Sequence, residues 1–175
     1  MPTRHVAALG ACVVVMLSMI AWLFLGMRAV MDIGGSCVSG GPYVSAQQCP
    51  DGAAAMLSVA VPVMMVAAFL GSWLAVSLRA PVLLLPMWWL VFGSLGWNFL
   101  EYGAFDGELV WGWLVCGVLF ELMALPALLF QLPWGRSAPA RIDPSPGAPR
   151  WWWAAYAGLA ALGAGLGSWT FHAWT

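Results

Sequence analysis

The sequence predicts an all-α integral membrane protein, a bundle of five transmembrane helices forming one domain over residues 1–175. Composition is the first reason, because 63% of the residues are hydrophobic and 7% are charged, whereas a soluble domain carries about a quarter charged residues. The second reason is that five windows stay apolar for about 20 residues, the length that crosses about 30 Å of hydrocarbon. The polar connections 28–52 and 133–150 are too short to build a second domain.

Each window begins or ends at a recognisable signal. The expected helices cover residues 6–27, 54–78, 82–100, 109–132 and 152–174. The first exceeds the apolar core of a cleaved signal peptide, so we expect it to remain as a membrane anchor. The second follows Asp51, which can cap helix amides, and the third follows a tight turn at Pro81. Trp111 and Trp134 bracket the fourth, and three consecutive tryptophans open the fifth, because indole rings favour the membrane interface.

The arginines predict the orientation. With the N-terminus inside, five arginines are cytoplasmic and only Arg28 is outside, as the positive-inside rule requires. The five are Arg4, Arg79, Arg136, Arg141 and Arg150. An odd number of spans then places the C-terminus outside. Loop 28–52 is therefore expected outside a plasma membrane and linker 133–150 in the cytoplasm.

The outer loop carries Cys37 and Cys49 in a polar, glycine-rich segment. Two such cysteines predict a disulfide, which is typical of an oxidising compartment and independently places the loop outside. We interpret the disulfide as a structural staple. The alternative is an exchangeable bond in a membrane thiol-disulfide oxidoreductase, although the chain contains no C-x-x-C motif.

Glu121 is the single ionisable residue deep within an expected span, about 18 Å from its outer end. Carboxyl groups inside a membrane are costly and indicate functional sites. Its candidate partners are the Ser18 hydroxyl and the indole N–H of Trp88 or Trp89. We expect a protonated Glu121 in an interhelical hydrogen bond; a proton- or cation-handling cavity and a lipid-facing carboxyl are the alternatives.

Two further patterns concern helix packing and the outer rim. Gly163 and Gly167 form a G-x-x-x-G face that allows close helix approach, either within the bundle or in a homodimer. At the outer surface, Glu101 can pair with Arg28, and Asp32 competes for the same arginine. We expect a solvated rim there, with no catalytic role. No His, Cys, Asp or Glu cluster has ligand spacing, so neither a metal nor a cofactor is expected.

The loop pattern G-G-x-C-x-S-G-G-P-Y followed by C-P, with an all-arginine, tryptophan- and alanine-rich composition, resembles uncharacterised multi-pass membrane proteins of high-GC actinobacteria. The resemblance covers residues 34–50 and the arrangement of spans around them, and it implies no activity. Disulfide-forming quinone reductases and vitamin K epoxide reductases are also small helical bundles with outward cysteines. Their mechanism is not carried over, because their C-x-x-C is missing here.

These observations favour a non-enzymatic accessory or interaction subunit of the plasma membrane. Its expected partners are the lipid bilayer and other membrane proteins or further copies of itself. A net charge of −1 without any lysine excludes a nucleic-acid footprint. A small transport or proton-handling protein centred on Glu121 and an oxidoreductase using Cys37 and Cys49 are the two alternative functions.

Overall fold

The computed structural model describes residues 3–35, 37, 48–105, 109–131, 149 and 151–174. Within them the chain forms five α-helices: α1 (Thr3–Asp32), α2 (Ala53–Leu78), α3 (Leu84–Ala104), α4 (Trp111–Gln131) and α5 (Trp151–Trp174). All five expected helices are therefore present, and α1 extends beyond its apolar window at both ends. Most of the expected cytoplasmic linker, with its arginines, and most of the outer loop lie outside the described residues.

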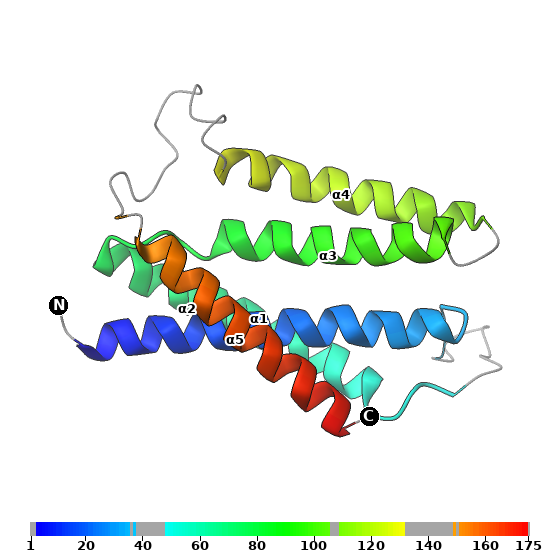
Figure 1. The fold of residues 1–175 in the computed structure, drawn as a ribbon, viewed down its shortest axis with the longest axis horizontal. Coiled ribbons are helices and arrows are strands. Elements are labelled where there is room, and N and C mark those ends of the chain that lie inside the picture. Colours follow the sequence, from blue (N-terminus) through cyan, green and yellow to red (C-terminus); the bar gives the residue numbers. More distant parts are fainter. Residues whose placement is uncertain are drawn as a thin grey trace.

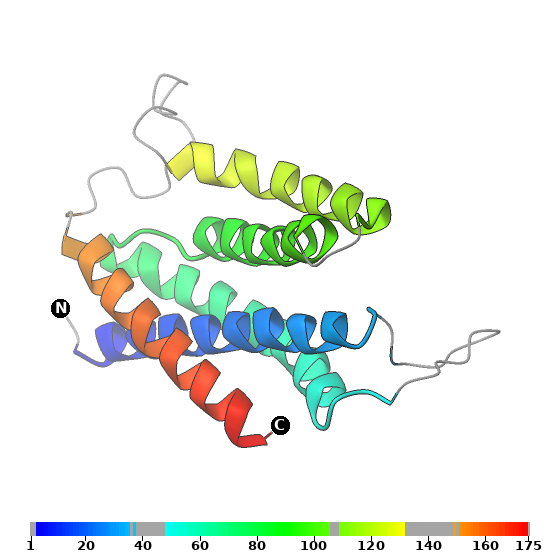
Figure 2. The same ribbon diagram turned by 45° about the vertical axis from the view of Figure 1, so that its right-hand side comes forward.

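Successive helices run in alternating directions, so the N-terminus and the C-terminus lie toward opposite ends of the bundle (Figure 1). Helix α1 is the centre of the fold and contacts α2, α3 and α5. Among the described helices, α4 packs on α3 alone and α5 on α1 alone. Figures 1 and 2 show α3 between α1 and α4, with α5 crossing α1 obliquely. Helix α4 is thus the outermost member of the stack α1, α3, α4.

The core lies between α1 and α2, where small side chains allow close approach. Ala60, Ala68 and Ala75 of α2 are fully buried, and they face a core that includes the large α1 residues Leu9 and Met16. The core continues into the turn between α2 and α3, the first turn of α3 and the start of α5. The buried side chains there are Leu83, Met87, Trp152 and Tyr156. The Tyr156 hydroxyl donates to the carbonyl oxygen of Pro81 at 2.8 Å, which holds α5 on this turn.

The ends of α2 differ from the expectation. Gly52, with a φ of 74°, precedes the helix, and no side-chain hydrogen bond caps it, so the expected Asp51 cap is wrong. A glycine is favoured there because this φ lies in the left-handed region. At the other end Arg79 adopts a φ of 54°, and the Ala80 amide donates to the Ala75 carbonyl at 2.9 Å. This arrangement is a helix stop of the kind that usually carries glycine.

Helices α3 and α4 pack by placing a glycine opposite a larger side chain. A Cβ added at Gly117 would lie 2.8 Å from Cγ of Leu100, and one at Gly103 would lie 3.0 Å from the Leu114 amide nitrogen. The two helices can approach this closely because Cβ atoms are missing at these contacts. Substitutions at these glycines should therefore separate α3 from α4.

Large apolar side chains cover the outer surfaces of α2, α4 and α5. Val66 and Trp73 of α2 are 61% and 73% exposed, and Leu122 of α4 is 57% exposed. Among the described residues, α1, α2 and α4 are long and apolar enough to cross a membrane. Exposed apolar surface on this scale is unfavourable in water and favourable in lipid, so the chain is identified as a membrane protein.

Candidate functional site

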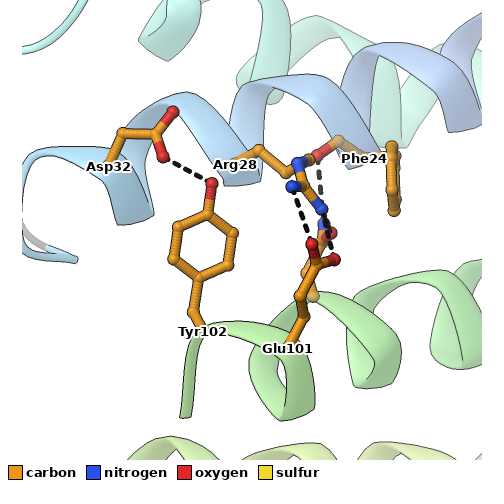
Figure 3. A network of polar contacts seen from close by, with 6 residues as sticks. Phe24, Arg28, Asp32, Glu101 and Tyr102 are labelled. Carbon is orange, nitrogen blue, oxygen red and sulfur yellow. Dashed lines mark hydrogen bonds and ion pairs between the residues drawn. The ribbon is translucent and has the colours of Figure 1, made fainter. Parts of the chain in front are cut away.

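The polar side chains of α1 and α3 meet near the outer-loop end of the bundle. Arg28 and Asp32 lie one turn apart at the end of α1, and Asn98, Glu101 and Tyr102 lie on one face of the last turns of α3. We call these five residues the outer polar cluster. Figure 3 shows the side chains of Arg28, Asp32, Glu101 and Tyr102 directed across the gap between the two helices. Four of its members lie beyond the expected apolar spans 6–27 and 82–100, and Asn98 lies within the last residues of the second of these spans.

Arg28 is the centre of the cluster. Its Nη1 donates to Oε2 of Glu101 at 2.6 Å and its Nη2 donates to Oε1 at 3.1 Å, which makes a two-point ion pair. Nη1 also donates to Oδ1 of Asn98 at 3.4 Å. The guanidinium carbon lies 5.2 Å from the Tyr102 ring centre and 5.6 Å from that of Phe24. The planar guanidinium therefore uses both its N–H donors and its charge within the chain.

Asn98 and Tyr102 join the two backbones more directly. Asn98 is fully buried, and its Nδ2 donates to the Phe24 carbonyl oxygen of α1 at 3.0 Å. The Tyr102 hydroxyl donates to Oδ1 of Asp32 at 2.5 Å. Asp32, which was expected to compete for Arg28, is thus occupied by Tyr102 while Arg28 binds Glu101. Because a buried amide is costly without partners, Asn98 sets the register of α3 along α1.

Electrostatics keep the central pair charged. The hydrogen bond from Arg28, followed by its positive charge, lowers the pKa of Glu101 below its ordinary value. The same hydrogen bond is the main reason that the pKa of Arg28 is raised. The two side chains remain 30% and 35% exposed, so solvent screens their attraction. Their chief contribution is to fix geometry, with little gain in stability.

The outer polar cluster offers little room for a substrate. Four of its members and Phe105 line a hollow of about 140 Å³, in contrast to the 300–1,000 Å³ or so of ordinary ligand pockets. The charged side chains at its wall are already paired with each other or with Tyr102. This arrangement can hold α1 against α3 and admit a few water molecules. It does not present a free nucleophile or base to a reacting molecule.

Glu121 lies in the interface between α3 and α4 and is partly exposed. A Cβ added at Gly96 of α3 would lie 2.8 Å from Oε1 of Glu121 and 3.0 Å from its Cγ. Gly96 therefore provides the space that the Glu121 side chain occupies. Within the described part of the chain, Glu121 has no hydrogen-bond or ion-pair partner.

The structure does not bring the three expected partners to Glu121. The Ser18 hydroxyl donates to the Gly163 carbonyl of α5 at 2.8 Å and to the Val14 carbonyl at 2.9 Å. Ser18 is out of reach because α3 lies between α1 and α4. The remaining two donors do join α3 to α4, but at other acceptors. Trp88 donates to the Met123 carbonyl at 3.0 Å, and Trp89 donates to Oε1 of Gln131 at 2.8 Å.

Gly163 and Gly167 pack α5 against α1. A Cβ at Gly163 would lie 2.5 Å from the Val14 carbonyl oxygen, and one at Gly167 would lie 2.5 Å from that of Ser18. The Trp22 indole adds a hydrogen bond to Oγ1 of Thr170 at 2.9 Å. Of the two uses expected for this glycine face, the structure forms the one within the bundle.

The disulfide between Cys37 and Cys49 is formed, with 4.7 Å between the two Cα atoms. The described ends of the outer loop lie against other helices. A Cβ at Gly35 would lie 2.9 Å from the Trp113 ring of α4, and one at Gly52 would lie 3.4 Å from the Trp174 carbonyl oxygen of α5. The disulfide therefore joins two loop ends that contact the first turn of α4 and the last turn of α5.

A shallow apolar groove of about 430 Å³ lies between α1 and α2. Its lining includes Cys12, Val15, Pro62 and Val66. The lining is apolar, so acyl chains of lipid or apolar side chains of another helix complement this surface. Neither this groove nor the outer hollow includes Glu121.

Sequence reasoning missed the buried role of Asn98 and the bond between Tyr102 and Asp32. One signal could have found them, because Asn98, Glu101 and Tyr102 repeat at intervals of three and four residues in an otherwise apolar helix. Such spacing places three polar side chains on one helix face. The first expected helix ends near Arg28 and Asp32, at the same depth as these three residues, so it is the expected partner for their polar side chains.

No protein-family model, curated protein or solved structure matches this chain. Function is therefore argued from the fold and from the chemistry of these residues.

Proposed function

We propose that the chain is a five-span plasma-membrane protein, with its N-terminus inside and its C-terminus outside, that acts as a non-enzymatic accessory or interaction subunit. Helices α3 and α5 contain 21 and 24 residues. At 1.5 Å per residue these are about 31 and 36 Å long, enough to cross the hydrocarbon core. Tryptophan and glycine, which membrane helices tolerate well, lower the hydropathy of both helices, and Asn98 and Glu101 lower that of α3 further near its end.

The distribution of charge supports the threading. Arg4 begins α1 and Arg79 ends α2, so both lie at the same end of two antiparallel helices. Arg28, Asp32 and Glu101 lie at the other end, together with the disulfide. An arginine-rich face and an oxidised face at opposite ends are what a plasma membrane imposes. The resemblance of the loop to actinobacterial membrane proteins is part of the same proposal.

One observation carries the accessory role. The charged side chains of the outer polar cluster bond to one another or to Tyr102, while the outward faces of α2, α4 and α5 present mainly apolar surface. Reaction centres keep reactive groups available to a substrate, whereas this arrangement uses them to hold helices together. The fold is therefore suited to presenting a rigid lateral surface to other membrane components.

Proton flux provides a direct test. The purified protein is reconstituted into liposomes that contain a pH-sensitive dye, and a pH gradient is imposed. An accessory protein gives the same decay of the gradient as protein-free liposomes. A faster decay that is abolished by Glu121→Gln and retained by the matched variant Gln131→Glu would contradict the accessory role and support proton handling. Gln131 is a suitable control because it lies on the same helix, at its inner end.

A further inference from the structure

A second copy of the chain can bind only a helix face that the bundle itself leaves free. The glycine face of α5, formed by Gly163 and Gly167, is the more obvious dimerisation surface, but it packs against α1 and is not available to a second copy. Helix α4 contacts α3 alone among the described helices. On α4, Val118 and Leu125 lie three residues before and four residues after Glu121, and they are 50% and 44% exposed. We call Val118, Glu121 and Leu125 the Glu121 edge; its spacing of three and four residues is that of a coiled-coil seam.

Glu121 lacks a hydrogen-bond partner among the described residues. Hydrocarbon offers a carboxyl group no hydrogen-bond partner, and an isolated charge is still more costly there. Within the described chain no donor reaches Glu121, because the hydroxyl and indole groups nearest to its depth bond elsewhere. Interhelical polar contacts are among the main forces that associate membrane helices. A carboxyl that has no partner among the described residues and lies at a partly exposed edge is therefore suited to a donor from a second copy.

The carboxyl group of a second copy is a donor that fits Glu121. Two copies threaded the same way are related by a two-fold axis along the membrane normal, so that each residue meets its equivalent at the same depth. A protonated carboxyl is both a donor and an acceptor, and two of them can satisfy each other. We propose that α4 is the dimerisation helix of this protein, and that the Glu121 carboxyl groups of two copies hydrogen bond to each other across the Glu121 edge. The proposal rests on the membrane threading given above and deepens it by naming the partner.

The test uses purified protein in liposomes, with Cys12 and Cys116 replaced by serine and the outer disulfide intact. A cysteine is introduced either by Leu125→Cys, on the Glu121 edge, or by Leu119→Cys, which is 55% exposed. Leu119 is a matched control, because two residues correspond to about 200° around the helix and place it opposite Glu121. Membrane-permeant copper phenanthroline then oxidises neighbouring thiols.

We expect Leu125→Cys to give covalent dimers. The fraction of covalent dimer should be about tenfold lower for Leu119→Cys. Adding Glu121→Leu should remove the dimer, whereas Glu121→Gln should retain it, because an amide also pairs with itself. In parallel, energy transfer between labelled copies should show the dimer dissociation constant rising about tenfold for Glu121→Leu. Equal crosslinking at the two positions, no crosslinking at Leu125→Cys, or no response to Glu121→Leu would overturn the proposal.

The outcomes separate this proposal from the one on which it rests. A protein that threads as proposed but stays monomeric refutes the dimer and leaves the threading intact. A protein with both termini on one side refutes the threading, and the crosslinking at positions 125 and 119 then still tests the dimer, because two copies that share any one threading place their Glu121 side chains at one depth. If Glu121→Leu fails to fold, the difference in crosslinking between Leu125→Cys and Leu119→Cys, measured with Glu121 in place, still tests the dimer.

Discussion

Replacing Gly163 by alanine should push α5 away from α1, and the structure allows the cost to be worked out. The new Cβ would lie 2.5 Å from the Val14 carbonyl oxygen and 2.9 Å from Cβ of Leu17. Since ordinary contact begins near 3.4 Å, the two helices must separate by about 0.9 Å at this point. The first obstacle is backbone, so the strain cannot be relieved by a change of rotamer.

Overpacking of this kind costs about 1–3 kcal/mol. The separation also stretches the 2.8 Å bond from Ser18 to the Gly163 carbonyl, and such bonds in membranes average about 0.6 kcal/mol. Alanine regains about 1 kcal/mol through its higher helix propensity. We therefore expect Gly163→Ala to lower the free energy of unfolding by about 0.6–2.6 kcal/mol.

Helix α5 contains its own control, since a Cβ at Gly165 meets nothing within 4 Å. Gly165→Ala should leave stability unchanged or raise it by up to about 1 kcal/mol. Both variants are compared by titrating the protein from lipid-detergent micelles into denaturing detergent while helicity is followed. Stabilities of the two variants that agree within about 0.5 kcal/mol would refute the packing assigned to α5.

Three further predictions concern the other interfaces. Gly117→Ala should lower stability by about 1–3 kcal/mol relative to Gly112→Ala, which has open space around it; equal unfolding curves would contradict the α3–α4 contact. Because the pKa of Glu101 is lowered in the folded state, its stabilising effect is complete above the ordinary carboxyl range and is lost as the pH falls through the lowered value. The stability difference between the wild type and Arg28→Ala should therefore be larger at about pH 7 than at about pH 3, and a difference that grows on acidification would count against the ion pair. Opening the outer disulfide, whose cysteines are 12 residues apart, should lower stability by about 3 kcal/mol in thermal unfolding with and without reductant, and unchanged unfolding would exclude a stapling role.

The five helices could be predicted because a bilayer demands long apolar segments and marks their ends with tryptophan and arginine. The exact first and last residues of each helix could not be predicted. Helix α1 continues to Asp32 because Arg28 and Asp32 gain partners on α3 that stabilise an additional turn. Asp51 matches a cap by residue type, but the chain enters α2 through a positive φ at Gly52. Both differences come from tertiary contacts or backbone geometry that local sequence does not encode.

The neighbours of Glu121 could not be predicted. The sequence indicates how deep a residue lies in the membrane, but it does not indicate which helix lies beside it. Ser18 and Glu121 lie at similar expected depths, yet α3 separates their helices and Ser18 bonds to α5. Helices that are apolar on every side carry no periodic signal of which face meets which partner. The glycine spacing of Gly163 and Gly167 was informative because close packing requires small residues wherever it occurs.

The threading of the chain through the membrane is tested most directly by reporters fused to its two ends. A fusion that fluoresces only in the cytoplasm and an alkaline phosphatase that is active only outside are attached in turn to each terminus. With five spans, the N-terminal fusion fluoresces and the C-terminal phosphatase is active. Activity of the same reporter at both ends would mean an even number of crossings and would contradict the account.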